Sequence, residues 1–278
     1  MSNSKNILIL GGDERQKHLN DLLIENKIQC TTIFTSQEKE YLYEYLSAAD
    51  TVILPLPITK DGENINSDND ELCLNIDEVV NSISPSQTVI GGIITKKIRT
   101  IFEDKQIKYF DFYADEGFIT YNAFLTAQGT VYLLLENTSE YVVSKKILIT
   151  GFGRVGKAVS HFMNVMGLDV YVAVRSETQK SEASSYGYRV IDISDIDSTV
   201  YLFDFIVNTV PSVIFSNNSI KLIKDDCVYI ELASAPFGAE REVFKKHEKK
   251  HIFAASLPGK LYPSASAKAI YKSISKYI

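Results

Sequence analysis

Tryptophan is absent from this 278-residue sequence, and cysteine is scarce. The three cysteines, Cys30, Cys73 and Cys227, are odd in number and far apart, and none belongs to a Cys-x-x-Cys pair. This pattern argues against a disulfide framework and is typical of a reduced compartment. From its first residues we expect no N-terminal signal segment, and the sequence contains no apolar run near the ~18 residues that span a bilayer. We therefore expect a cytoplasmic protein with no membrane partner.

Positive charge is also in short supply. Lys and Arg number 29 against 35 Asp and Glu, which gives a net charge of −6. Proteins that bind nucleic acids usually have a basic face, so we expect no nucleic-acid partner for this protein. The sequence contains no Gly-x-Ser-x-Gly or His-Glu-x-x-His motif and no Cys/His cluster at metal-ligand spacing, so we expect no metal site. A local cationic pocket for an anionic substrate is compatible with this composition.

Short apolar runs alternate with amphipathic stretches along the whole chain, which is typical of parallel sheets flanked by helices. The chain is long enough for two such domains. We predict an α/β protein with two parallel-sheet, Rossmann-like domains and an interdomain cleft. The predicted strands are Ile7–Leu10, Thr51–Leu54, Thr88–Ile90, Tyr109–Phe112, Lys146–Thr150, Asp169–Val174, Phe205–Asn208 and Cys227–Glu231.

The domain boundaries follow from two candidate helices. Ile119–Asn137 has no internal proline and lies between the two strand–helix series, so it predicts a linker helix. Ala265–Tyr277 predicts an amphipathic C-terminal helix that crosses back to the first domain. We assign residues 1–119 with 262–278 to a substrate domain, 120–141 to the linker and 142–261 to a dinucleotide-binding domain. The polar segment Lys60–Glu71 predicts a solvated loop, with a lid over a site as the alternative.

The strongest motif is Gly151-Phe-Gly-Arg-Val-Gly156, which follows a buried-type strand and precedes a helix. In such a turn the first glycine permits the bend, the second lets a pyrophosphate approach the backbone, and the third allows close helix packing. The helix N-terminus then binds the phosphate. The motif predicts a nicotinamide dinucleotide on this turn; the alternative is a turn that has lost its ligand. The turn residues expected to bind it are Gly151, Gly153, Arg154, Val155 and Gly156.

The end of the next strand favours NADP over NAD. An NAD site usually has Asp or Glu there to bind the ribose 2′-hydroxyl, but this sequence has Arg175 and Ser176. A guanidinium and a hydroxyl can bind a 2′-phosphate, which a carboxylate would repel. The alternative is that Arg175 is only a solvated charge at a strand end.

Two later strand ends are expected beside the same cofactor, because ligands bind beyond the carboxyl ends of parallel strands. Asn208-Thr-Val-Pro211 suits a loop near the nicotinamide ribose, and Ala233 lies in the segment that follows the next strand. We include Asn208, Thr209, Pro211 and Ala233 among the cofactor-binding candidates, although Asn-Thr-x-Pro is also a good turn sequence.

Candidates for substrate binding lie in the first domain and at the domain crossings. Asp13 follows a glycine turn and can cap the next helix, and Arg15 can bind a carboxylate bidentately. Asn122 and Thr126 lie near the start of the linker helix, where the cleft is expected. Lys260, at the second crossing, is another candidate carboxylate ligand.

These motifs, in this order, resemble the A-subunit family of dipicolinate synthase, sporulation enzymes of endospore-forming Firmicutes. The resemblance spans nearly the whole chain, and three motifs make it specific. They are Gly11-Gly-Asp-Glu-Arg15-Gln16, Asn208-Thr-Val-Pro211-Ser212 and Glu231-Leu-Ala-Ser234-Ala-Pro236-Phe-Gly238, supported by Leu257-Pro-Gly-Lys260. Two departures are Tyr262-Pro-Ser-Ala-Ser-Ala267, where the family often has Ala-Pro-x-Thr-Ala-Gly, and Gln128, where a glutamate is expected.

The resemblance implies NADP-dependent oxidation of a dihydrodipicolinate-type intermediate of the lysine pathway to dipicolinate, in the mother cell of a sporulating bacterium. It also implies a dicarboxylate substrate and, as partner, a flavoprotein-like B-subunit of dipicolinate synthase, while a homo-oligomer stays open. For this chemistry we expect Arg15 and Lys260 to bind the carboxylates and Asn122 and Thr126 to orient the ring. Asp13 is the nominee for the base.

Two other functions stay open. A 2-hydroxy-acid or amino-acid dehydrogenase shares the expected architecture, but the hydroxy-acid enzymes use a histidine base, and none of the four histidines lies in a convincing cleft loop. A non-catalytic, regulatory NADP-binding protein that assists a catalytic partner is the second alternative.

Overall fold

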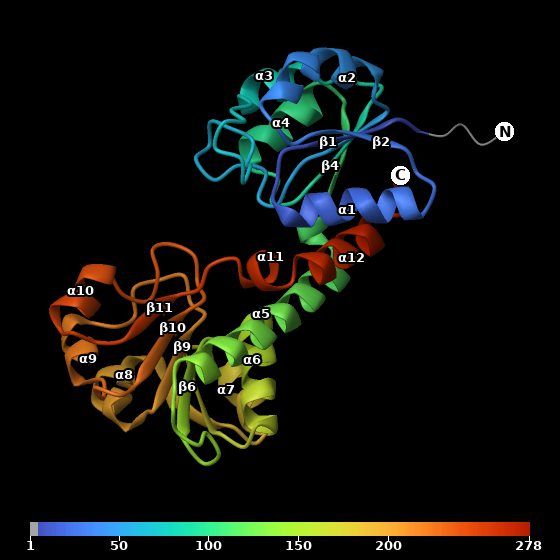
Figure 1. The fold of residues 1–278 in the computed structure, drawn as a ribbon. Coiled ribbons are helices and arrows are strands. Elements are labelled where there is room, and N and C mark those ends of the chain that lie inside the picture. Colours follow the sequence, from blue (N-terminus) through green and yellow to red (C-terminus); the bar gives the residue numbers. More distant parts are fainter. Residues whose placement is uncertain (1–4) are drawn as a thin grey trace. The chain divides into compact units, whose positions relative to one another are not determined.

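A computed structural model describes residues 5–278. The chain forms two compact units (Figure 1). The first unit comprises the residues up to Asn122 together with Pro258–Ile278, and the second comprises Ala123–Leu257. The long helix α5, Glu116–Glu136, runs from the first unit into the second.

The first unit contains a five-stranded, wholly parallel sheet with the order β2-β1-β3-β4-β5. This is the 2-1-3-4-5 order of flavodoxin-like sheets, whose switch point lies between β1 and β3. The strands are β1 Ile7–Leu10, β2 Cys30–Ile33, β3 Thr51–Ile53, β4 Thr88–Gly91 and β5 Lys108–Asp111. The helices are α1 Glu14–Glu25, α2 Leu42–Ala48, α3 Ile76–Ser82, α4 Lys96–Asp104 and α12 Pro263–Ile274.

Alternation along β1 builds two hydrophobic layers, because successive strand side chains point to opposite faces. Leu8 and Leu10 pack in a cluster with residues of α2, α3 and α4, whereas Ile7 and Ile9 pack with residues of α1 and α12. Both faces of the sheet are therefore covered, which explains why its central strands are mostly apolar.

The C-terminal helix α12 returns to the first unit, as the sequence predicted. Its buried residues Ala267, Ile270 and Ile274 share a cluster with Leu19 and Leu23 of α1. Figure 1 shows the two helices side by side beneath the sheet.

The second unit contains a six-stranded, wholly parallel sheet with the order β11-β10-β9-β6-β7-β8. Numbered within the unit, this is the 3-2-1-4-5-6 order of dinucleotide-binding folds, with the switch point between β6 and β9. The strands are β6 Lys146–Thr150, β7 Asp169–Val174, β8 Arg189–Asp192, β9 Phe205–Asn208, β10 Val228–Glu231 and β11 His251–Phe253. The helices are α6 Arg154–Val165, α7 Glu177–Ser185, α8 Ile196–Thr199, α9 Asn217–Leu222 and α10 Arg241–Lys246.

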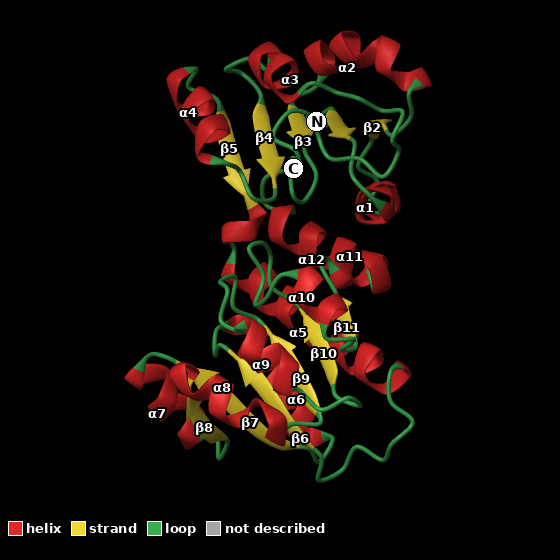
Figure 2. Ribbon diagram, turned by 90° about the vertical axis from the view of Figure 1, so that its left-hand side faces the viewer, coloured by secondary structure: helices red, strands yellow, loops and turns green. Residues whose placement is uncertain are grey.

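Helices cover both faces of this sheet as well (Figure 2). Ile147 and Ile149 pack with apolar residues of α5, α6 and α7, whereas Leu148 packs with those of α8, α9 and α10. The prediction of two parallel-sheet α/β folds is thus confirmed.

The segment Lys60–Glu71 is not wholly solvated, contrary to expectation. Ile65 and Asn66 are buried, and Gly12 N donates to Asn66 O at 2.7 Å while Asp68 N donates to Gly12 O at 2.8 Å. The middle of the segment is therefore bound to the glycine turn after β1, although its charged ends are exposed.

Within residues 5–278, no helix is long and apolar enough to cross a membrane. The same residues contain no group of three His, Cys, Asp or Glu side chains placed to hold a metal ion.

Candidate functional site

The turn after β6 lies at the switch point of the second sheet, and each of its glycines has a distinct geometry. Gly151 has a φ of 83°, and a Cβ on it would lie 2.8 Å from Thr209 Oγ1. A Cβ on Gly156 would collide with the carbonyl oxygen of Gly151. Gly153, the N-cap residue of α6, would place a Cβ in open space. The backbone is thus accessible at Gly153, where a dinucleotide pyrophosphate approaches in this type of turn, so the residues present fit such a cofactor.

Arg154 and Val155 complete the turn. Arg154 is exposed at the first position of α6, whereas Val155 is half-buried and packs on the apolar cluster of the second unit. Val155 thus contributes to packing, whereas the exposed Arg154 places a positive charge at the start of α6.

The end of β7 presents Arg175 and Ser176, and both are exposed. Ser176 is the N-cap residue of α7, but its hydroxyl makes no capping hydrogen bond. The nearest carboxylate in sequence, Glu177, binds Lys180 at 2.7 Å. The strand end therefore offers a cation and a hydroxyl, while the adjacent carboxylate already has a cationic partner.

A buried hydrogen-bond network joins the ends of β6, β9 and β10. Asn208 is fully buried, its Oδ1 accepts from Thr150 Oγ1 at 2.5 Å, and its Nδ2 donates to Glu231 Oε1 at 2.6 Å. The same amide also bonds to both backbone polar groups of Val210. The side chain of Asn208 is thus occupied by protein partners and holds the loop that carries Thr209 and Pro211.

Glu231 is the centre of this network, and it is 1% exposed. Besides Asn208, its carboxylate accepts from Ala233 N at 3.0 Å, Gly238 N at 2.9 Å and the Tyr229 hydroxyl at 3.0 Å. Burial raises the pKa of Glu231, although these hydrogen bonds oppose the rise. No role of its own was assigned to Glu231 from the sequence; its position at the end of an apolar strand was the available sign of a buried carboxylate.

Two of the proposed cofactor residues are held by hydrogen bonds at these strand ends, and a third lies in the same loop. Thr209 is half-buried, and its hydroxyl donates to Thr150 O at 2.7 Å. Pro211 is exposed in the same loop. Ala233 is buried, with its N–H on Glu231. The network thus determines how the β9 and β10 loops present their surfaces.

In the first unit, Asp13 and Arg15 bind each other beside the glycine turn that follows β1. Arg15 Nε donates to Asp13 Oδ1 at 2.8 Å and Nη2 to Asp13 Oδ2 at 2.7 Å, and Nη2 also donates to Leu56 O at 2.5 Å. Asp13 additionally forms a capping box with Gln16 at the start of α1. The Arg15 side chain is 7% exposed, so Asp13 compensates a nearly buried charge.

The structure brings the Lys260 segment onto Arg15. A Cβ on Gly259 would lie 2.9 Å from Arg15 Nε, so the short helix α11, Leu257–Leu261, packs directly over the guanidinium. Lys260 itself is exposed. The two predicted carboxylate ligands therefore come from adjoining backbone segments.

Asn122 and Thr126 lie one turn apart on α5, and both are half-buried. Asn122 belongs to the first unit and Thr126 to the second. Residues four apart lie on the same face of a helix, so these side chains share one face of α5.

Two family models match the chain. Residues 6–113 match the N-terminal domain of the dipicolinate synthase A-subunit, and residues 125–257 match the NAD-binding domain of D-isomer-specific 2-hydroxyacid dehydrogenases. The dipicolinate synthase A-subunit of Bacillus subtilis (strain 168) is 24% identical over 285 residues, covering 98% of this chain and 95% of the relative. The chain is a homologue of the A-subunit family of dipicolinate synthase.

Solved structures agree with this homology at the level of the fold. The dipicolinate synthase A-subunit of Bacillus halodurans superposes with a TM-score of 0.87 at 20% identity, covering 100% of this chain and 98% of the other. D-lactate dehydrogenase of Lactobacillus jensenii gives a TM-score of 0.61 at 12% identity, covering 97% and 94%. The second unit is thus a dehydrogenase-type NAD(P)-binding domain within a homologue of the dipicolinate synthase A-subunit.

The buried network allows a stability test. In Glu231→Gln, an amide NH2 replaces one carboxylate oxygen and faces either Gly238 N–H or Ala233 N–H, so at least one backbone donor loses its acceptor. We expect the free energy of unfolding to fall by about 1–3 kcal/mol, measured by denaturant titration. Glu240→Gln, on an exposed carboxylate, is the control and should change it by less than about 0.5 kcal/mol. Equal stability of both variants would contradict a structural role for Glu231.

Proposed function

We propose that this protein acts as the dipicolinate synthase A-subunit, which oxidises a dihydrodipicolinate-type ring to dipicolinate with NADP. The observation that carries the proposal is the turn at Gly151–Gly156, which is open at Gly153 and is followed by a strand end bearing Arg175 rather than a carboxylate. The homology to this family supplies the substrate class.

The preference for NADP rests on charge. Its 2′-phosphate carries up to about two negative charges near neutral pH, given a second pKa of roughly 6. Arg175 and Ser176 are exposed where the adenosine ribose of a dinucleotide ends in this fold, and Glu177 is paired with Lys180. These side chains would attract a phosphate there, whereas an unphosphorylated ribose gains no carboxylate acceptor.

The protein must hold the substrate through the substrate's own two carboxylate groups. Arg15 Nη1 makes no hydrogen bond among residues 5–278, whereas Nε and Nη2 are occupied by Asp13 and Leu56, so Nη1 is the atom proposed to bind one carboxylate. Lys260, beside Gly259, is proposed to bind the other. Asp13 is then better suited to orient Arg15 than to act as the base, because both its oxygens accept from the guanidinium. The base stays unassigned.

When bound, the nicotinamide supplies a hydride acceptor. The ring loses one hydride and one proton and becomes an aromatic pyridine, so the chain's own contribution is orientation and exclusion of water. Asn122 and Thr126 are proposed as orienting groups. The same proposal includes an interdomain cleft and pairing with a flavoprotein-like B-subunit. It also includes a location in the mother cell of a sporulating bacterium.

The deciding experiment incubates the purified protein with freshly generated dihydrodipicolinate and NADP, with and without the B-subunit, while NADPH and dipicolinate are followed. We expect both products in equal amounts. Turnover of a 2-hydroxy acid instead would favour the dehydrogenase alternative. NADP binding without any turnover, even when the B-subunit is present, would favour a regulatory role.

Cofactor preference is tested at Arg175. We expect the wild-type protein to bind NADP more tightly than NAD. Arg175→Ala should cost about 1–3 kcal/mol in NADP affinity and leave NAD affinity nearly unchanged, because only the 2′-phosphate loses a charged partner. Calorimetric titration of NADP and NAD measures this, with Lys221→Ala on the exposed end of α9 as the control. A variant that binds both cofactors more weakly by the same factor would refute the assignment.

Substrate binding is tested at Arg15. Arg15→Ala removes a charge-assisted contact worth about 1.5–3 kcal/mol, which corresponds to a rise in KM of roughly 10- to 150-fold. NADP affinity should stay constant, because Arg15 lies in the first unit. Steady-state kinetics compare this variant with Arg15→Lys, which keeps the charge, and with Arg99→Ala, which removes an exposed charge on α4. Weakening of substrate and NADP alike would make Arg15 a purely structural residue.

A further inference from the structure

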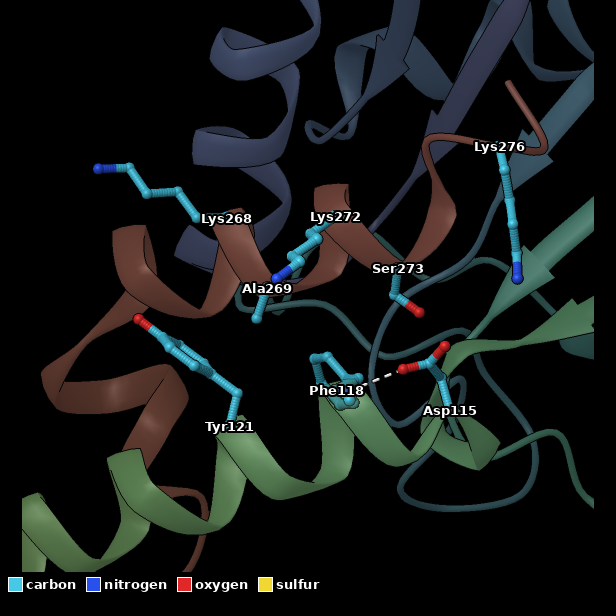
Figure 3. A pocket seen from close by; sticks show the side chains of 9 residues that line it. Asp115, Phe118, Tyr121, Lys268, Ala269, Lys272, Ser273 and Lys276 are labelled. Carbon is cyan, nitrogen blue, oxygen red and sulfur yellow. Dashed lines mark hydrogen bonds between the residues drawn. The ribbon is translucent and has the colours of Figure 1, made fainter.

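A cavity lined by none of the candidate site residues lies within the first unit, between α12 and the start of α5. Its volume is about 340 Å³, and its lining includes Phe118 and Tyr121 of α5 and Ala269 of α12. Figure 3 shows the two aromatic side chains below and α12 above the open space. The cavity thus has an apolar wall large enough to hold part of an organic molecule.

Three lysines line the same cavity. Lys268 and Lys272 are one turn apart on α12, and Lys276 follows one turn later, beyond the helix end. Within residues 5–278 none of the three makes an ion pair with a carboxylate. Lys276 lies over the rings of Phe110 and Tyr277 instead, with its Nζ 5.8 and 5.1 Å from their centroids. In Figure 3 the Lys268 side chain extends away from α12 at the edge of the cavity, while the Lys276 side chain points to the side where Asp115 lies.

Asp115 is the one carboxylate in the lining, and it is already engaged. Its Oδ1 accepts from Phe118 N at 2.8 Å and caps the start of α5. Three lysines against this one carboxylate leave an excess of positive charge in the cavity. Gly117, in the first turn of the 21-residue helix α5, adds backbone without a side chain at the positive end of the helix dipole.

Ser273 provides an independent sign of a ligand. The residue lines the cavity and is 8% exposed, yet its Oγ is buried and makes no hydrogen bond with any of residues 5–278. An unsatisfied buried hydroxyl costs about 1–3 kcal/mol, so a native structure usually provides it with a partner. The hydroxyl points from α12 toward the start of α5 (Figure 3), where a bound anion would accept from it.

Phosphate suits these groups better than a carboxylate. Lysine binds phosphate as a compact point charge, whereas bidentate carboxylate binding favours arginine, and no arginine lines this cavity. We propose that the cavity between α12 and the start of α5 binds a phosphomonoester with an apolar or aromatic body. The phosphate lies by Lys272, Lys276 and Ser273, and the organic body lies against Phe118, Tyr121 and Ala269. This site is independent of the proposed oxidation.

The test is calorimetric titration of the full chain, saturated with NADP, with phenyl phosphate and with inorganic phosphate at low ionic strength. We expect phenyl phosphate to bind more tightly than inorganic phosphate, because only the former fills the apolar wall. Lys272→Ala and Ser273→Ala should each weaken phenyl phosphate by about threefold to tenfold. Lys96→Ala removes an exposed lysine of α4 that forms no ion pair with the described residues, and it should leave the affinity for phenyl phosphate unchanged.

Thermal unfolding separates a binding role of Ser273 from a structural one. Removing a hydroxyl that has no partner should leave Ser273→Ala at least as stable as the wild-type protein, so that a loss of affinity cannot come from unfolding. Four results would overturn the site. The first two are no binding of phenyl phosphate, and a loss of phenyl phosphate affinity in Lys96→Ala as large as that in Lys272→Ala. The other two are unchanged phenyl phosphate affinity in Ser273→Ala, and weaker NADP binding in Lys272→Ala.

Discussion

All strands within each sheet run parallel, and this constraint determines where the sites are. Parallel strands place their carboxyl ends along one edge, and the chain must then cross over by a helix that starts near that edge. At the switch point, neighbouring helices leave on opposite faces and the loops separate. The turn after β1 and the turn after β6 both lie at such points. The charged pair Asp13–Arg15 and the open Gly153 are consequences of these positions.

In the second unit the glycine turn and the buried network have complementary roles. The turn leaves its backbone accessible because a side chain is absent at Gly153. The network positions the neighbouring loops by polar side chains that are buried. Asn208 and Glu231 use their polar atoms in hydrogen bonds within the protein and are almost inaccessible to solvent. A buried carboxylate without a cation is tolerable only when all its acceptor positions are used. The loops beside the turn are therefore held by polar groups that never reach the surface.

The central strands could be read from the sequence because both of their faces are buried. Three of the four edge strands, β2, β8 and β11, were not predicted, since their residues are only partly buried and polar side chains interrupt them. The fourth, β5, was predicted through its aromatic residues Tyr109 and Phe110. The prediction of a solvated loop over Lys60–Glu71 was wrong in part for a related reason. The composition of this segment is that of a solvated loop, but two of its residues are bound to Gly12 by contacts that no local pattern records.

The sequence by itself determined the fold class, the return of the C-terminal helix and the turn at Gly151–Gly156. Each of these depends on periodicity or on backbone freedom, which are properties of neighbouring residues. Only the tertiary structure decided how the ionisable and hydroxyl groups are partnered. Asp13 binds Arg15 beneath Gly259, Glu231 is buried among four donors, and the Ser273 hydroxyl has no partner in the described part of the chain. Burial and pairing depend on segments far apart in the chain, so the spacing of residues along the sequence does not encode them directly.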